Sequence, residues 1–364
     1  MIIRAALLIL LIAGVVRAQQ TRPSAGNTTE RASIIHAKSL VIDAHIDVLY
    51  HLTRTGSTAD LSQRRSSGHF DFIRAQEGGL DASFFAIFVS NRFNAQPNGA
   101  FNEAQRLIKM LNRIVTAHPK LAEFAYSPED VLRLSNAGKH AVIMSLENGT
   151  PIGNDLARLR QFYDQGIRYI TLCHNQDNQI CDSSYDRRHT HRGLSAFGKQ
   201  VVAEMNRLGI MIDVSHVSDQ AFWQVLQLSQ LPVIASHSSL RTFRSFGRNL
   251  SDEMLLGLRK NGGVVCFNFG SMFLSDDYRR HKQTLQDVIK HIDYAVKLIG
   301  VDHVGLGSDF DGVDEVPRGL EDVSAYPKIT EALLQLGYSE EDIFKINGGN
   351  VLRVWRENDS RSAP

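Results

Sequence analysis

The feature that most constrains this chain is a short apolar run followed by a helical stretch, repeated along most of its 364 residues. Eight runs have the length and composition of buried strands: Leu40–Ala44, Ala82–Val89, Ala141–Leu146, Arg168–Leu172, Ile210–Ser215, Pro232–Ser236, Val264–Phe269 and His303–Ser308. Between them apolar residues recur at helical spacing, as in 102–117, 195–208 and 284–299. Strands alternating with helices predict a parallel sheet of βαβ units, and eight units predict a single closed (β/α)8 barrel of the TIM type. An open doubly wound sheet is the alternative, because boundaries between Ser90 and His140 are vague.

The N-terminus has the layout of a cleavable signal peptide. A positive start at Met1–Arg4 precedes the apolar run Ala5–Val16, and Ala18 supplies the small residue of a cleavage site. The run is too short to span a bilayer comfortably, although an uncleaved N-terminal anchor is the alternative. We expect a signal peptide at 1–18, a flexible leader at 19–31, one barrel domain at 32–358 and a polar tail at 359–364. The mature protein is expected to be exported, either periplasmic or secreted, with no stable membrane anchor.

Charge and cysteine content argue against two broad classes of protein. Lysine and arginine number 40 against 39 acidic residues, a formal net charge of +1. Nucleic-acid-binding domains normally carry a marked positive excess, so no nucleic-acid partner is expected. The three cysteines, Cys173, Cys181 and Cys266, are too few for a disulfide framework. Pairing of Cys173 with Cys181 across their loop stays open.

Metal-binding residue types follow the ends of the predicted strands, which is where barrels of this class carry their function. The first strand runs into His45 and Asp47, whose side chains share one face of an extended backbone. Glu147, His216 and His237 end three further strands. Imidazole and carboxylate groups suit a divalent transition metal, and a buried carboxylate that bridges two metals is fully compensated.

These five residues divide into two half-sites. With Glu147 shared, each half-site has three protein ligands and leaves room for a common water or hydroxide. Two adjacent metals activate such a water at neutral pH and polarise a carbonyl or phosphoryl group. Any one histidine could instead be a hydrogen-bonded residue at a strand end, but the joint set predicts a binuclear metallohydrolase. His174 and Asp309 also end predicted strands and join the candidate site.

Eight ordered segments then carry a family resemblance. They are 41–47 (VIDAHID), 169–175 (YITLCHN), 193–198 (GLSAFG), 206–209 (NRLG), 212–218 (IDVSHVS), 235–239 (ASHSS), 305–312 (GLGSDFDG) and 319–322 (GLED). Together they resemble the membrane (renal-type) dipeptidases, peptidase family M19 of the amidohydrolase superfamily. The resemblance extends from about Ser39 to Val354, nearly all of the mature chain.

The resemblance implies an activity and a cofactor. It implies a zinc-dependent dipeptidase that hydrolyses free dipeptides, including those with a C-terminal D-residue, through a hydroxide that bridges the metals. Two Zn²⁺ ions per chain are implied, one held by His45, Asp47 and Glu147 and the other by Glu147, His216 and His237. Homodimers occur in the family, and no stretch of this sequence establishes one.

The resemblance also gives roles to three residues outside the ligand set. His174 would face the substrate carbonyl near the developing oxyanion. Arg248 would bind the C-terminal carboxylate of the substrate, although neighbouring Arg241 and Arg244 keep a surface salt bridge open as its alternative role. Asp309 would take a proton from the attacking water and deliver it to the leaving amine. Asp311, two residues later, is the competing candidate for that proton transfer.

Two other functions stay open. The first keeps the barrel and its metals but changes the bond, giving a related amidohydrolase that acts on a lactam, an N-acyl amino acid or another small amide or ester. The second, from a different class, is a metal-poor binding protein without catalytic activity. Within the dipeptidase hypothesis, the loop at 175–193 is expected to narrow the barrel mouth and exclude longer peptides.

Overall fold

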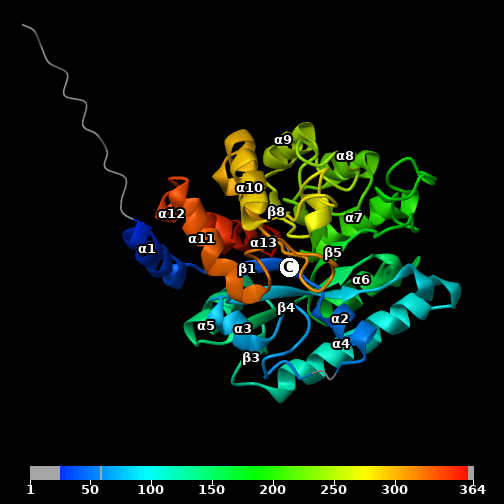
Figure 1. The fold of residues 1–364 in the computed structure, drawn as a ribbon. Helices are drawn as coiled ribbons and strands as arrows, with labels where there is room; N and C mark the ends of the chain where they lie inside the picture. Colours follow the sequence, from blue (N-terminus) through cyan, green and yellow to red (C-terminus); the bar gives the residue numbers. More distant parts are fainter. Residues whose placement is uncertain (1–24, 58–59, 360–364) are drawn as a thin grey trace, which may run out of the picture.

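The computed structural model describes residues 25–57 and 60–359 (Figure 1). The expected signal peptide at 1–18 and residues 360–364 of the polar tail lie outside the described residues. Among the residues that are described, no helix combines the length and the apolar character needed to cross a membrane.

The predicted barrel is confirmed. Eight parallel strands follow one another in the order β1-β2-β4-β5-β6-β7-β8-β9. Their bounds are β1 Ile42–Ile46, β2 Ala82–Phe88, β4 His140–Glu147, β5 Ile167–Thr171, β6 Met211–Asp213, β7 Ile234–Ser238, β8 Val264–Phe267 and β9 Val304–Leu306. Each of the eight apolar runs of the sequence contains or overlaps one of these strands, so the alternative of an open sheet is wrong.

The barrel closes between its last and first strands just beyond the end of β9. The amide of Asp309 donates to the carbonyl of His45 at 3.0 Å, and the amide of Asp47 donates to the carbonyl of Phe310 at 2.8 Å. A parallel bridge joins Ile46 to Phe310 at the same place. The closure therefore brings the segment after β9 against the C-terminal end of β1, where several of the candidate site residues lie.

Helices surround the strands (Figure 1). They are α1 Ala25–Lys38, α2 Val48–Thr55, α3 Phe72–Glu77, α4 Gly99–Ala117, α5 Pro128–Asn136, α6 Ala157–Asp164, α7 Ala196–Leu208, α8 Asp219–Leu228, α9 Asp252–Asn261, α10 Leu285–Ile299, α11 Tyr326–Gln335, α12 Glu340–Phe344 and α13 Asn350–Asp359. Serines at the N-caps of α7, α8 and α9 accept a hydrogen bond from the third backbone amide of the helix. Gly209 and Gly262 end α7 and α9 in the left-handed conformation that favours glycine.

The stretch between Ser90 and His140, whose boundaries are vague in the sequence, holds two helices and one additional strand. Helix α4 and helix α5 flank β3, Ala122–Phe124, which pairs in parallel with β4. Only three residues long, β3 gives too short an apolar pattern to be recognised. It lies outside the circle of eight strands and leaves the barrel topology unchanged.

The expectation of a flexible leader at 19–31 is wrong for its second half. Helix α1 begins at Ala25, and it packs beside α11 (Figure 1). Ala32 and Ile35 are buried, and the ring of His36 bonds Thr330 Oγ1 and the carbonyl of Gly78. The polar composition of the segment hid the helix, because its apolar contacts begin only at the end of the predicted leader.

The barrel interior is filled by side chains and sealed at its lower end by α13. Val351, Val354 and Trp355 of α13 belong to the same buried cluster as the inward residues of the strands. Trp355 is fully buried with its ring 5.7 Å from that of Phe84, measured between centroids. The upper end of the barrel, where the strands terminate, is therefore the end that is left open for a site.

Candidate metal centre

The upper ends of four strands deliver the five candidate ligands. His45 lies within β1, and Asp47 is the N-cap residue of α2 just beyond it. Glu147 is the last residue of β4, and His237 lies within β7. His216 follows β6 by three residues, where the backbone turns out of the strand. All five side chains are buried, and each is at most 6% exposed.

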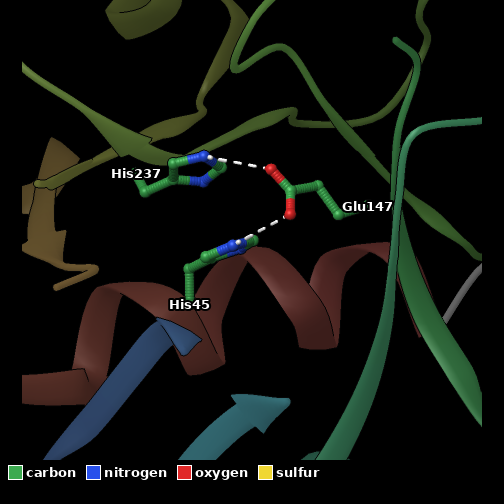
Figure 2. A group of neighbouring side chains, drawn as sticks. All are labelled: His45, Glu147 and His237. Carbon is green, nitrogen blue, oxygen red and sulfur yellow. Dashed lines mark ion pairs between the residues drawn. The ribbon is translucent and has the colours of Figure 1, made fainter. Parts of the chain in front are cut away.

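Glu147 is the centre of this group, and Figure 2 shows it between His45 and His237. Its Oε2 lies 3.6 Å from Nε2 of His45, while its Oε1 lies 3.6 Å from Nε2 of His237 and 3.3 Å from Nε2 of His216. Asp47 completes the set, with Oδ2 3.1 Å from Nε2 of His45. The five predicted ligands are thus brought together around one carboxylate, as a shared bridging ligand requires.

The donor atoms form three overlapping groups rather than two separate half-sites. Within each group the possible ligand atoms lie within 4.8 Å of one another: His45, Glu147 and His237; Glu147, His174 and His216; and His45, Asp47 and Asp309. His174 and Asp309, predicted from the sequence as catalytic residues, therefore border the ligand cluster directly. Each of the three groups has donor atoms close enough together to hold a metal ion.

Two residues without a predicted role orient the imidazoles. The hydroxyl of Tyr169 donates to the carbonyl of Ala44 at 2.9 Å, so it accepts the proton on Nδ1 of His45, 2.6 Å away. The hydroxyl of Ser236 donates to Asp213 Oδ2 and likewise accepts from Nδ1 of His237, each at 2.7 Å. Both bonds hold a proton on Nδ1 and so direct Nε2 of each ring toward the cluster.

Two buried aspartates tie the strand ends together beneath the cluster. Asp43 accepts from the amide and hydroxyl of Ser308 and from the hydroxyl of Tyr326. Asp213 accepts from the amide and hydroxyl of Ser236 and from Thr171 Oγ1. Asp43 thus joins β1 to the segment after β9, and Asp213 joins β6 to β5 and β7. No single residue indicates this layer in the sequence, because its bonds link segments far apart in the chain.

The electrostatics differ from one imidazole to the next. Although burial opposes it, neighbouring Tyr169, Glu147 and Asp47 raise the pKa of His45 well above its usual value. Burial, helped by the positive charge of Arg248, lowers the pKa of His216 and of His237 well below the usual value, so both rings are neutral. Burial raises the pKa of Asp47 to about 6, and the charge of Glu147 adds to this. Burial and then the charge of Asp47 raise the pKa of Asp309 well above its usual range. The two neutral imidazoles and the crowded carboxyl groups form an environment that favours a bound dication.

The unpaired atoms of the cluster also fit a metal. Oδ1 of Asp47 and Nδ1 of His216 are buried without a hydrogen-bond partner. Nε2 of His216 faces Nε2 of His237 at 2.9 Å, and at most one proton can lie between those two nitrogens. Buried polar atoms without partners are costly in a folded protein unless an ion or water satisfies them. Oxygen and imidazole nitrogen donors at these distances suit Zn²⁺ or a similar divalent ion.

A cleft of about 290 Å³ opens above the cluster. Asp47, Glu147, His174, His216 and Asp309 lie along its floor and walls. Burial lowers the pKa of His174 to about 3, so its ring is neutral and can donate a hydrogen bond. The loop at 175–193 contributes Asn175 and Tyr185 to the wall, as expected for a loop that narrows the mouth.

Arg248 is the buried arginine among the three near the site. It is 4% exposed, and its Nη1 and Nη2 donate to Ser238 Oγ and to the carbonyl of His237. Its Nε has no partner, and its guanidinium carbon lies 5.9 Å from the ring centre of Phe273, which lines the cleft. Arg241 and Arg244 instead form surface ion pairs with Asp219 and Asp276. The alternative of a surface salt bridge therefore applies to them and not to Arg248.

Asp309 and Asp311 occupy different surroundings. Asp309 Oδ2 accepts from Nδ2 of Asn268 at 2.7 Å, and its carboxyl belongs to the ligand cluster. Asp311 Oδ1 accepts from the amide of His69 at 2.6 Å and so anchors a neighbouring loop. The geometry favours Asp309 for chemistry at the metals, and it adds Asn268 as a residue that positions Asp309.

Backbone conformation at the mouth is unusual. His216 and Asp309 have φ angles of 71° and 63°, in the left-handed region that non-glycine residues rarely adopt. Each such residue costs about 1 kcal/mol, and strain of this kind concentrates at functional sites. Gly312 makes a further demand, because a Cβ there would lie 2.4 Å from both Asp309 Oδ1 and Asp47 Oδ2. The carboxylates therefore require a residue without a side chain at this position.

Comparison with known proteins finds similarity along most of the chain. The profile of the membrane dipeptidases, peptidase family M19, matches residues 29–363. The dipeptidase tcpJ of Claviceps purpurea is 38% identical over 303 residues, which cover 82% of this chain and 71% of that protein.

Two solved structures extend the comparison to three dimensions. The probable dipeptidase PvdM from Pseudomonas aeruginosa is 30% identical with a TM-score of 0.84, covering 93% of this chain and 100% of that one. A metallopeptidase from Rhodobacter sphaeroides, solved with a phosphinate mimic of the dipeptide L-Ala-D-Ala, is 28% identical with a TM-score of 0.79. The similarity covers 88% of this chain and 99% of that one.

Proposed function

The chain belongs to the membrane dipeptidase family, peptidase family M19, and from this we propose that it is a two-zinc enzyme that hydrolyses free dipeptides, including L-Xaa-D-Xaa. That it is a metal-dependent dipeptidase follows from the family. The observation that supports the finer proposal is the buried carboxylate of Glu147, which lies within 3.6 Å of Nε2 of four histidines: His45, His174, His216 and His237. The L-Ala-D-Ala mimic bound to the Rhodobacter relative supports tolerance of a C-terminal D-residue.

The proposed ligands are those of the cluster. His45 and Asp47 would hold one ion, His216 and His237 the other, and Glu147 both. Zinc bound there would acidify a water molecule and polarise the scissile carbonyl. The protein itself prepares the ligands, because Tyr169 and Ser236 turn the Nε2 lone pairs of two histidines toward the ions.

The remaining residues would bind and orient the peptide. Two of the five N–H donors of Arg248 are used in the bonds to Ser238 and His237, which leaves others for the C-terminal carboxylate of a substrate. Neutral His174 would donate to the carbonyl oxygen as negative charge develops on it. Asp309, whose pKa is raised by burial, would hold the proton taken from the attacking water and pass it to the leaving amine.

The aromatic side chains at the wall of the cleft support a preference for short substrates. Tyr185 of the loop at 175–193 lies over the ring of His216, with the centroids 5.9 Å apart, and Phe246 packs against the other edge of Tyr185. A free carboxylate bound at Arg248 would lie one residue beyond the scissile bond, and longer chains would have to pass this aromatic wall.

The test is release of amino acids from L-Ala-L-Ala, L-Ala-D-Ala, their C-terminal amides and L-Ala-L-Ala-L-Ala by zinc-loaded protein, together with metal analysis. We expect about two zinc ions per chain and cleavage of the free dipeptides alone. Arg248→Gln should lower kcat/KM for free dipeptides at least tenfold, since a charged hydrogen bond is worth roughly 1.5–3 kcal/mol. Arg244→Gln, which removes a nearby surface ion pair, is the matched control. Two bound zinc ions without dipeptide cleavage would instead favour a different small amide or a lactam.

We also propose that the protein is exported, periplasmic or secreted, after cleavage behind Ala18. The charged start, the apolar run at 5–16 and the small residues near 18 support this. N-terminal sequencing of protein recovered outside the cytoplasm should begin at Gln19, and a mature chain that still begins at Met1 would contradict it.

A further inference from the structure

A second cleft adjoins the one above the metals. It has a volume of about 620 Å³, more than twice that of the metal cleft, and the two share the wall formed by Tyr50, Phe88, His174 and Asn175. Because these residues line both spaces, a ligand bound over the metals has an open route into the second one. We call this second space the side cleft; its far wall is formed by Arg54, Asn91, Arg92, Phe93 and Glu103.

The side cleft lies across the barrel from Arg248. Its inner wall is built on the end of β2 and on α2, which follows β1. Arg248 is bonded to residues of β7, and three strands separate β7 from β2 in either direction around the barrel. A dipeptide whose C-terminal carboxylate is held by Arg248 and whose carbonyl lies near His174 therefore extends its N-terminal residue toward the side cleft.

The charge of the side cleft is positive and largely uncompensated. Among the described residues, Arg92 has no carboxylate partner; its guanidinium lies 4.7 Å from the ring centre of Phe93. Arg54 reaches only Asp314, at 3.6 Å, and that carboxylate is 93% exposed. Glu103 is the acidic side chain of the cleft, and Arg106 already binds both of its oxygens at 2.7 Å. An anionic group entering the cleft would thus meet two available guanidinium groups.

The entrance to the side cleft is aromatic. The rings of Tyr50 and Phe88 meet edge to face with centroids 5.3 Å apart, and Phe88 lies 4.6 Å from the ring of His174. An aliphatic stem suits these ring faces, while its charged end continues to the arginines. A long side chain that ends in a carboxylate matches both the entrance and the far wall.

We propose that the side cleft binds the side chain of the N-terminal residue of the substrate and selects an acidic one, with glutamate preferred. This inference rests on the proposed dipeptidase function and specifies the substrate class of the same site. It depends on the contiguity of the two clefts, on their position opposite Arg248 and on the two guanidinium groups that no buried acid neutralises.

The test compares kcat/KM for four dipeptides that differ only at the first residue: L-Glu-L-Ala, L-Gln-L-Ala, L-Lys-L-Ala and L-Ala-L-Ala. Because Arg92 is exposed, we expect Glu to exceed Gln by about fivefold and Lys to fall below Gln, in keeping with a solvent-screened ion pair. The preference should shrink in 0.5 M NaCl, where charges are screened over roughly 4 Å. Arg92→Glu should remove the preference for Glu over Lys, because its charge offsets that of Arg54, and Arg92→Gln should reduce the preference.

Arg259→Glu is the matched control. Arg259 is an exposed arginine in the last turn of α9, at the end of the barrel opposite to the C-terminal ends of the strands. The same change of charge there should leave the order of the four dipeptides unchanged. Equal kcat/KM for Glu, Gln and Lys dipeptides, or an order that Arg92→Glu does not alter, would overturn the inference while the dipeptidase function stands. If the protein cleaved no dipeptide, L-Ala-L-Ala included, the proposed dipeptidase function itself would be refuted.

Discussion

Removal of one hydroxyl, by Tyr169→Phe, should weaken metal binding without disturbing the barrel. The phenol of Tyr169 is fully buried, and burial raises its pKa, so it is protonated at every pH at which the protein would be assayed. Its hydroxyl makes two hydrogen bonds, to Nδ1 of His45 at 2.6 Å and to the carbonyl of Ala44 at 2.9 Å. The ring packs on Phe84 at 5.1 Å between centroids, and phenylalanine keeps that contact.

The size of the effect follows from these two bonds. Each neutral hydrogen bond contributes about 0.5–1.5 kcal/mol, so the free energy of unfolding of the metal-free protein should fall by about 1–3 kcal/mol. Loss of the partner on Nδ1 also frees the ring of His45 to rotate or change tautomer, and changes of this kind cost roughly 10- to 100-fold in metal affinity. Metal binding should therefore suffer beyond what the loss of stability alone explains.

Two measurements separate these effects. Competition with a chelator gives the affinity for each Zn²⁺, and urea unfolding of chelated protein gives the stability. Tyr338→Phe is the control, because its hydroxyl also makes a hydrogen bond, to Asp293 at 3.0 Å on the outside of the barrel. If Tyr169→Phe binds both ions as tightly as the unaltered protein, the hydroxyl does not orient His45 and the reasoning is wrong.

Three further outcomes are expected. In chelated protein, burial and the charge of Glu147 raise the pKa of Asp47 from 3.8 to about 6, so the folded state holds the proton more tightly than the unfolded state. The free energy of unfolding should therefore fall by up to about 3 kcal/mol as the pH rises from 4 to 7. Urea unfolding at several pH values should show a flatter profile for Asp47→Asn and for zinc-loaded protein. Gly312→Ala should fold but lose zinc affinity and activity, because its Cβ would meet two carboxylate oxygens at 2.4 Å, and an active, metal-loaded variant would contradict the close packing. Asn268→Ala should lower kcat with little change in KM or zinc content, because Asn268 donates a hydrogen bond to Asp309 and to none of the five proposed ligands. Steady-state kinetics with metal analysis test this, and a loss of zinc in the variant would contradict it.

The barrel was predictable because its strands are buried on both faces. Eight apolar runs separated by helical periodicity leave few other topologies, and serines and glycines mark several helix ends. The additional strand at 122–124 and the helix beginning at Ala25 were missed for a common reason. Both depend on contacts with residues distant in sequence, and neither has a long enough apolar pattern of its own.

The ligand cluster was predictable because strand ends converge in a barrel, so residues spread over almost two hundred positions meet at one edge. The supporting residues were not. Tyr169, Ser236 and Asn268 have residue types that are common in buried strands and loops, and only the folded structure shows that their polar atoms touch His45, His237 and Asp309. The choice of Arg248 over Arg241 and Arg244 as the candidate for substrate binding likewise depends on which guanidinium is buried, and only the folded structure shows this.

Because α13 closes the lower end of the barrel, the order in which the ribosome makes the segments of the chain affects when the barrel can finish folding. The side chains that seal the lower end of the barrel, Val351, Val354 and Trp355, are among the last described residues of the chain, yet they pack against strands made much earlier. A nascent chain that has already left the ribosome as far as β9 still has an uncapped apolar core, so the barrel cannot reach its final stability before α13 has been made. If the chain is exported as proposed, this delay is useful, because a polypeptide whose barrel core is completed only by α13 stays open longer and is easier to carry across a membrane.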